Sequence, residues 1–170
     1  NNYYNLDLSI AGDIYNHGTW TNDDNYLTGT ADQNLMFTQP FEGEDLIDND
    51  PGSNLKALSD LSFIGTDIDL GGVDLYIPLN AILSLTDVYL VDGSISSPGF
   101  IFNMNGSSYM QNISAENITL SGTVRVRNNV IFSGVNQVIG TLQNYGNNNY
   151  TLQVDGDLEN NGIIENNYYS

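Results

Sequence analysis

The first and last segments of the chain repeat one phrase. Residues 6–22 read LDLSIAGDIYNHGTWTN, and residues 152–166 read LQVDGDLENNGIIEN. Both follow the pattern apolar-x-apolar-x-G-D-[IL]-x-N-x-G-x-apolar-x-N, with two extra residues before the Gly-Asp pair of the first copy. Apolar residues at alternate positions are typical of strands, and Gly and Asn are typical of the turns between them. A repeated unit of this kind predicts the stacked coils of a β-solenoid, which share one continuous core.

Strand-like stretches recur along the rest of the chain. Short runs of alternating apolar residues are separated by Gly-Gly, Asp-Gly, Asn-Gly and Ser-Gly pairs, and no clear apolar stripe of helical period is present. At about 20–25 residues per coil, the chain is predicted to be an all-β, parallel β-helix of about seven coils. The alternative is a β-sandwich or jelly roll, which the same strands could build. We expect residues 1–170 to form a single domain, with an acidic loop insertion at about residues 40–54.

Alternation also predicts which side chains face the core. On two late strands, the apolar residues should point inward and the polar residues between them outward. The inward set is Val124, Val126, Leu152 and Val154. The outward set is Arg125, Arg127 and Gln153.

The chain is strongly acidic. It contains 21 Asp and Glu against 3 Lys and Arg, which gives a formal net charge of -18. Such a charge repels nucleic acids and anionic membrane surfaces, so neither is expected as a partner. No apolar run approaches the roughly 20 residues that span a bilayer, and the lack of cysteine excludes disulfides and thiolate metal sites. Cations, glycans or other copies of the chain remain as expected partners.

Two further phrases accompany the repeat. Residues 27–35 (LTGTADQNL) and 132–139 (FSGVNQVI) share an apolar-[TS]-G beginning and a [DN]-Q-x-apolar end. Together with the G-D-[IL]-x-N-x-G phrase, they resemble the repetitive β-helix-like regions of large secreted surface proteins and adhesins of the Bacteroidetes type. The resemblance covers most of the chain outside the acidic segment. It implies a β-helix outside the cell or on its surface, and its motifs carry no catalytic residues.

The acidic segment is a candidate metal site. Residues 42–54 read EGEDLIDNDPGSN, which places oxygen-bearing side chains at alternate positions in a stretch bent by Pro and Gly. Calcium loops gather roughly six to eight oxygen ligands in this way, so Ca²⁺ is the predicted ion. The alternative is a solvated acidic loop. The candidate ligands are Glu44, Asp45, Asp48, Asp50 and Asn54.

Catalytic candidates are few. Asp67 and Asp69 alternate with apolar residues, so both carboxylates should point outward from one strand. Carboxylates on neighbouring coils could act as general acid and base on a glycan, but a plain polar strand face explains them as well. The only histidine, His17, falls in a turn of the repeat, and no G-x-S-x-G elbow is present. We therefore do not expect an enzyme.

Aromatic and apolar residues gather at the two ends of the sequence. Solenoids usually cover their terminal coils with polar caps, and neither end of this sequence shows an evident cap. The end coils are therefore predicted to stack on further coils, supplied head to tail by a second copy or by adjoining repeats of a longer chain. The residues expected at these contacts are Tyr3, Tyr4, Leu6, Leu8, Ile164, Tyr168 and Tyr169.

The sequence thus favours a non-enzymatic structural or adhesive segment of an extracellular filament, sheath or surface adhesin, which assembles end to end through open coils. The alternative is a β-helix protein that binds or processes glycans. Long uniform fibres would favour the first function, and discrete monomers that degrade a glycan would favour the second.

Overall fold

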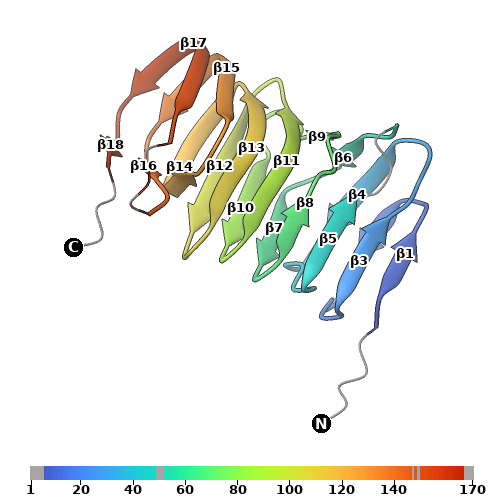
Figure 1. Cartoon of the computed structure of the whole chain (residues 1–170). Coiled ribbons are helices and arrows are strands. Elements are labelled where there is room, and N and C mark those ends of the chain that lie inside the picture. Colours follow the sequence, from blue (N-terminus) through green and yellow to red (C-terminus); the bar gives the residue numbers. More distant parts are fainter. Residues whose placement is uncertain (1–5, 49–51, 147, 149, 167–170) are drawn as a thin grey trace.

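The structure is a computed structural model that describes residues 6–48, 52–146, 148 and 150–166. These residues form strands and turns and no helix, and the strands pair in parallel between coils. Figure 1 shows the coils stacked in one direction, from β1 (Leu8–Ile10) to β17 (Leu152–Asn160) and β18 (Ile163–Glu165). The stack makes about eight turns. The predicted parallel β-helix is confirmed, with about one turn more than expected, and the sandwich alternative is wrong.

The coils contribute strands to three faces of the solenoid. Face A carries β1, β3 (Asp24–Leu27), β5 (Asp45–Asp48), β8 (Asp67–Asp69), the first halves of β11 (Tyr89–Ser96) and β13 (Tyr109–Glu116), the end of β14 (Ile118–Val126), β16 (Thr141–Asn144) and β18. Face B carries β2 (Ile14–Asn16), β4 (Gln33–Phe37), β6 (Leu55–Ala57), β9 (Asp74–Tyr76), the second halves of β11 and β13, and the first halves of β15 (Val130–Val138) and β17. Face C carries β7 (Leu61–Ile64), β10 (Ile82–Thr86), β12 (Phe100–Asn105), the first half of β14 and the ends of β15 and β17.

The core fills the space between the three faces. Alternate residues of each strand point inward, and most of them are apolar and buried. On the face C side, Trp20, Phe41 and Phe63 stack in register, with ring centroids 5.5 and 5.7 Å apart. Burying one such phenylalanine contributes about 1.5–3 kcal/mol to stability. Phe41 and Phe63 therefore anchor the first coils to one another.

One corner turns the chain from face A to face B through residues in a left-handed conformation. Asp92, Asn112 and Asn129 have φ angles of 58°, 53° and 48°, which Asn and Asp tolerate better than other non-glycine residues. Asn112 Nδ2 donates to Asp92 Oδ1 at 2.6 Å, and Asn129 Nδ2 donates to Asn112 Oδ1 at 3.0 Å. These side chains link successive coils along the corner and hold them in register.

The repeated phrase forms the same turn in both of its copies. The backbone N–H of Gly18 donates to Asn16 Oδ1 at 3.1 Å, and that of Gly162 donates to Asn160 Oδ1 at 3.1 Å. The Asn-x-Gly part of the phrase is thus a local turn signal. Asn16 and Asn160 therefore have a structural role, which is to stabilise the turn.

The predicted side-chain register of the late strands is confirmed. Val124 and Val126 are buried, and Arg125 and Arg127 point outward and are partly exposed. Gln153 is exposed as expected. The inward residues of β17 are the informative exception, because Leu152 and Val154 keep considerable exposure although they lie on the core side.

The acidic loop insertion predicted at about residues 40–54 is wrong for residues 45–48. These residues form β5, which pairs in register with β3 and β8 on face A. Because this segment is rich in acidic residues, its strand alternation was not recognised from the sequence. The side chains of β5 alternate between the two sides of the strand, and those of Leu46 and Asp48 face the core. This segment is therefore a regular part of its coil.

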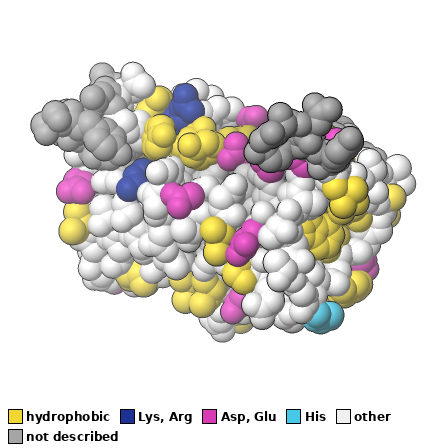
Figure 2. All heavy atoms as spheres, turned by 90° about the horizontal axis from the view of Figure 1, so that it is seen from below, with side chains coloured by type: hydrophobic (Ala, Val, Ile, Leu, Met, Phe, Trp, Pro, Cys, Tyr) yellow, Lys and Arg dark blue, Asp and Glu magenta, His cyan; other side chains and the backbone are white. Residues whose placement is uncertain are grey.

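The surface of the solenoid reflects the composition of the chain. Figure 2 shows one side, on which acidic side chains are spread along the length while basic side chains lie in one half. In the sequence, two of the three basic residues are Arg125 and Arg127, whereas residues 42–74 are rich in Asp and Glu. Within the described part of the chain, no helix has the length and apolar character needed to cross a membrane.

Candidate functional site

An acidic column runs along face A. The strands β3, β5 and β8 each begin with an aspartate, and the register places Asp24 beside Asp45 and Asp45 beside Asp67. These three residues, the acidic column, lie on the outer side because the residue after each of them is buried. Paired strands lie about 4.8 Å apart. Three carboxylates of like charge therefore follow one another on successive coils.

Crowding changes the protonation of these carboxylates. Partial burial raises the pKa of Asp45, and the charges of Asp24 and Asp67 raise it further. Partial burial also raises the pKa of Asp67. A hydrogen bond with Asp23, together with its charge, raises the pKa of Glu44 beside the column. Each shift favours the neutral carboxyl group, which means that the fold disfavours the ionised form of these groups.

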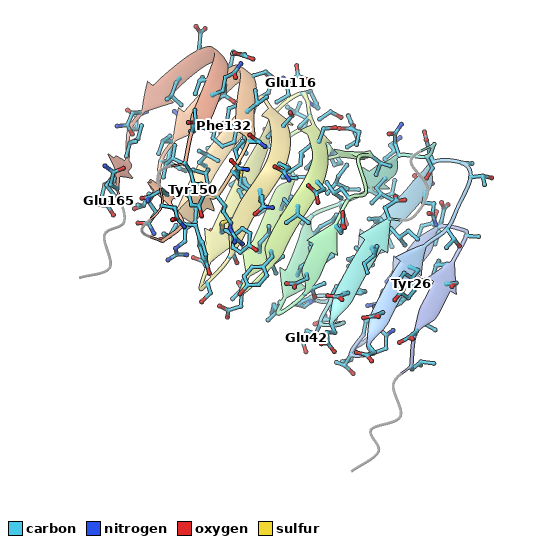
Figure 3. The ribbon with its side chains drawn as sticks, in the orientation of Figure 1. Tyr26, Glu42, Glu116, Phe132, Tyr150 and Glu165 are labelled. Atoms are coloured by element: carbon cyan, nitrogen blue, oxygen red, sulfur yellow. The ribbon has the colours of Figure 1, made fainter. Side chains whose placement is uncertain are left out.

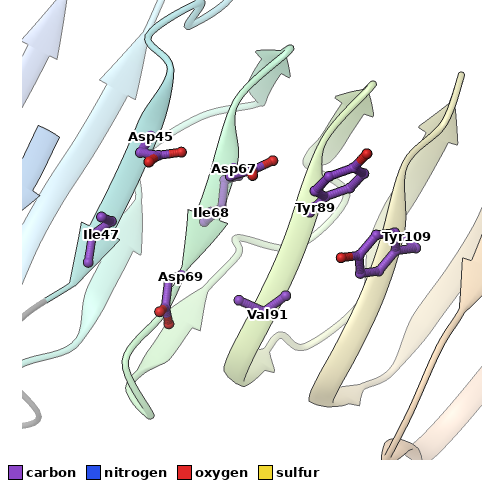
Figure 4. A pocket seen from close by; sticks show the side chains of 8 residues that line it. All are labelled: Asp45, Ile47, Asp67, Ile68, Asp69, Tyr89, Val91 and Tyr109. Atoms are coloured by element: carbon purple, nitrogen blue, oxygen red, sulfur yellow. The ribbon is translucent and has the colours of Figure 1, made fainter. Parts of the chain in front are cut away.

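Tyrosines continue the acidic column on the next coils. Tyr89 pairs in register with Asp67 on one side and with Tyr109 on the other. The rings of Tyr89 and Tyr109 stack with centroids 4.4 Å apart and 24° between their planes, and the ring of Tyr145 lies 4.6 Å from that of Tyr109. We call Tyr89, Tyr109 and Tyr145 the tyrosine column. One ring face of Tyr89 is covered by Tyr109, and its other side borders the acidic column (Figure 4).

Arg127 holds the tyrosine column in place. Its guanidinium carbon lies 5.1 Å from the ring centroid of Tyr109 and 5.9 Å from that of Tyr145. Arg127 Nη1 also donates to the hydroxyl of Tyr109 at 2.9 Å. Hydrogen bonds with Tyr150 and Tyr109 raise the pKa of Arg127. The contact of this cation with the rings of Tyr109 and Tyr145 stabilises their arrangement. Tyr150 is labelled in the same half of the stack in Figure 3.

A groove of about 320 Å³ opens where the acidic and tyrosine columns meet (Figure 4). It forms because the short side chains of Asp45 and Asp67 are followed in register by the much larger Tyr89. Ile47 and Val91, two residues further along their strands, add apolar surface to its lining. The groove therefore combines aromatic and apolar surface with a few hydrogen-bond acceptors, which is the composition of small-ligand sites.

Asp69 completes the lining of the groove. Its Oδ1 accepts a hydrogen bond from the backbone N–H of Gly71 at 2.9 Å, which orients the carboxylate. Asp67 and Asp69 both lie on the outer side of β8, with Ile68 buried between them, as the alternation predicted. The single histidine, His17, lies exposed in its turn, away from this groove.

The structure separates the predicted calcium ligands. Asp45 lies on the outer side of β5 and Asp48 on the inner side, where it is 4% exposed, so one ion cannot bind both as expected. Glu44 is exposed, and Asp50 lies outside the described residues. Asn54 belongs to a corner, where its Oδ1 accepts from the backbone N–H of Asp74 at 3.3 Å. The described residues contain no group of three or more His, Cys, Asp or Glu that could hold a metal ion. Calcium binding stays a prediction, which melting curves with and without a chelator test.

The predicted assembly residues fall on the end coils or outside the described part. Leu6 is 61% exposed and Ile164 is 51% exposed, while Leu8 is partly buried. The four predicted tyrosines lie outside the described residues, and these are Tyr3, Tyr4, Tyr168 and Tyr169. The structure thus places the described assembly residues on the first and last coils, at opposite ends of the stack (Figure 1).

Comparison with known proteins adds no relative to these observations. No protein-family model matches the chain, and no curated protein or solved structure matches it either. Its function therefore has to be inferred from its own residues.

Proposed function

We propose that the chain is a non-enzymatic structural or adhesive segment of an extracellular filament, sheath or surface adhesin, and that its open end coils bind further coils. The observation that supports this most directly is a comparison of the last two coils. Leu142 is 3% exposed, whereas Ile164, its partner in register on the last coil, is 51% exposed. Both side chains lie on the core side of face A. Ile164 differs in having no coil above it among the described residues.

The same contrast holds on face B and at the other end of the stack. Phe132 is buried, but its register partner Val154 is partly exposed. At the first coil, Ile10 is partly exposed although its partner Leu27 is fully buried. Covering this apolar surface with another coil lowers the free energy of the system. The open strand edge of an end coil also presents backbone N–H and C=O groups that a further strand can pair with.

Either a second copy or an adjoining stretch of a longer chain can supply the covering coil. When copies supply it head to tail, the contact joins two different surfaces and does not close on itself, so it produces a filament. The extracellular setting is proposed from the resemblance of the repeated phrases to the β-helix-like regions of secreted surface proteins.

Electron microscopy and sedimentation of the purified 170-residue chain test the proposal. The intact chain should form uniform fibres whose fraction rises with concentration. Ile164→Lys places a charge on the core side of the last coil and should leave short soluble species. Ile163→Lys is the matched control, because Ile163 is similarly exposed, at 53%, but pairs with the outward-facing Thr141. It should assemble like the intact chain.

The first coil offers a second pair of variants. Leu8→Lys should block assembly, and Ser9→Lys, on the exposed side of the same strand, should not. A chain that stays monomeric at every concentration would contradict assembly through copies. Discrete monomers that degrade a glycan would contradict the non-enzymatic function.

A further inference from the structure

We propose that the groove between the acidic column and the tyrosine column binds an uncharged glycan. This inference goes beyond the stacking function, because the groove lies on the side of the solenoid. Its strands β5, β8, β11 and β13 belong to coils in the interior of the stack (Figure 1). A ligand in the groove would therefore leave both end coils free to bind further coils.

The aromatic wall of the groove suits a sugar ring. Tyr109 covers one face of the Tyr89 ring and Arg127 holds Tyr109, so the position of Tyr89 is set before a ligand binds. The face of an aromatic ring carries partial negative charge. The C–H bonds on one side of a pyranose carry partial positive charge and pack against such a face. Val91, two residues after Tyr89 on β11, and Ile47, two residues after Asp45 on β5, add apolar surface to the lining of the groove.

The carboxylates supply the polar half of the recognition. Asp45, Asp67 and Asp69 line the groove on neighbouring strands and accept hydrogen bonds without competing as donors when ionised. Hydroxyl groups of a sugar are donors, and hydrogen bonds to an ionised acceptor are about twice as strong as neutral ones. Donors from the ligand would also relieve the crowding of like charges along the acidic column.

The charge of the site selects the kind of glycan. Asp24, Asp23 and Glu44 lie beside the groove on the acidic end of face A, so a uronic acid or a sulfated sugar would meet several carboxylates. A metal ion or a lysine-rich protein would be attracted by the charge but would leave the apolar contacts of Ile47 and Val91 unused. An uncharged sugar uses the aromatic wall, the apolar surface and the acceptors together.

Titration calorimetry of the intact chain with a panel of oligosaccharides tests this proposal. The probes are cellohexaose, laminarihexaose and mannohexaose as uncharged glycans, and oligogalacturonate and oligoalginate as anionic ones. At least one uncharged probe should bind, and it should bind more tightly than either anionic probe. Tyr89→Ala should weaken that binding by about tenfold, the value of one good aromatic contact.

Tyr76→Ala is the matched control. Tyr76 is also an outward, partly buried tyrosine on a strand, but it lies on face B beside Lys56, outside the groove. Its binding should equal that of the intact chain. Since Tyr89→Ala removes a stacked ring, the double variant Asp45→Asn, Asp67→Asn gives a second measurement that keeps the tyrosine column intact. It should also bind more weakly.

Three results would overturn the proposal. The first is that no uncharged probe binds at millimolar concentration. The second is that Tyr89→Ala, folded as judged by its melting curve, binds as well as the Tyr76→Ala control. The third is that trilysine or calcium chloride binds more tightly than every uncharged oligosaccharide and does so equally well after Tyr89→Ala.

Discussion

Asp13 and Asp45 show how neighbouring coils decide the behaviour of the same side chain. Asp13 accepts hydrogen bonds from the backbone N–H and the side-chain amide of Asn34, at 2.8 and 3.0 Å. These donors lower the pKa of Asp13, the backbone donor most strongly. Asp45 instead has aspartates on both neighbouring strands, and burial together with their charges raises its pKa. The fold thus favours the ionised form at one position and opposes it at the other.

Removing the charge of Asp45 should stabilise the protein at neutral pH. Because the folded-state pKa of Asp45 is raised, the stability that its protonation contributes is present at low pH and is lost as pH rises through the folded-state pKa. Asp45→Asn should therefore raise the melting temperature at pH 7 in low salt, by up to about 4 °C. The difference from the intact chain should shrink as the pH falls and Asp45 becomes protonated.

Asp13→Asn is the control at the same scale. It removes an anion that the fold favours, so it should lower the melting temperature at pH 7 rather than raise it. Circular dichroism melts between pH 4 and pH 8 measure both variants. A lower melting temperature for Asp45→Asn at pH 7 would show that the acidic column is stabilised by contacts other than those described.

Glycines line the corner between faces C and A in the last coils, where the backbones of successive coils approach closely. A Cβ atom on Gly140 would overlap the carbonyl oxygen of Gly122, and a Cβ on Gly162 would overlap that of Gly140. Gly122 also has a φ of 67°, which favours glycine. The coils can therefore stack here only without side chains at this corner.

Gly140→Ala should destabilise the solenoid by about 1–3 kcal/mol, because the added methyl group must push two coils apart. Gly12→Ala is a suitable control, since a Cβ at Gly12 meets nothing within 4 Å. Urea unfolding measures both. An unfolding free energy for Gly140→Ala equal to that of Gly12→Ala would mean that the two coils separate at little cost.

Strands were predictable from the sequence, but their alignment between coils was not. The alternation around Val124 and Val126 was sufficient to assign the inward side correctly. The alignment depends on how many residues each corner holds, and this number varies. Leu46 pairs with Ile68, whereas Met110 pairs with the much closer Val126.

The candidate site could not be predicted from the sequence either, because it depends on the same alignment between coils. The sequence indicated that Asp67 and Asp69 share one side of a strand, and this is confirmed. It could not indicate that Tyr89 lies directly beside Asp67, because that contact joins two coils through corners of unpredictable length. The calcium prediction treated residues 44–54 as one loop, whereas residues 45–48 form a strand that places Asp45 on its outer side and Asp48 on its inner side.

At the scale of the whole molecule, each coil contacts mainly the coils before and after it. Stability in such a stack is close to a sum of terms for single coils and for their interfaces. An interior coil has two interfaces, and an end coil has one among the described residues. Exposure follows this rule, since Phe102 of β12 is fully buried while Leu158 of β17 is 39% exposed.

Hydrogen exchange should therefore follow a gradient along the stack. Amides of β17 and β18 should exchange at least about tenfold faster than those of β12, because local opening at an end breaks fewer interfaces. Exchange measured by mass spectrometry on the unassembled chain tests this. In the proposed fibres, the end coils should be protected as well. Uniform protection in the unassembled chain would indicate that the solenoid opens only as a whole.

The strand pairing of the three faces also has a mechanical consequence. Hydrogen bonds between coils run along the axis of the stack, and β1 and β18 lie at its opposite ends. A pull on the strands at the two ends, along the axis, opens the hydrogen bonds of an end coil one after another, so the coils separate in sequence from an end. A force across the axis loads all the bonds of an interface together. The solenoid is therefore an anisotropic rod, which peels under tension along its length and resists shear across it.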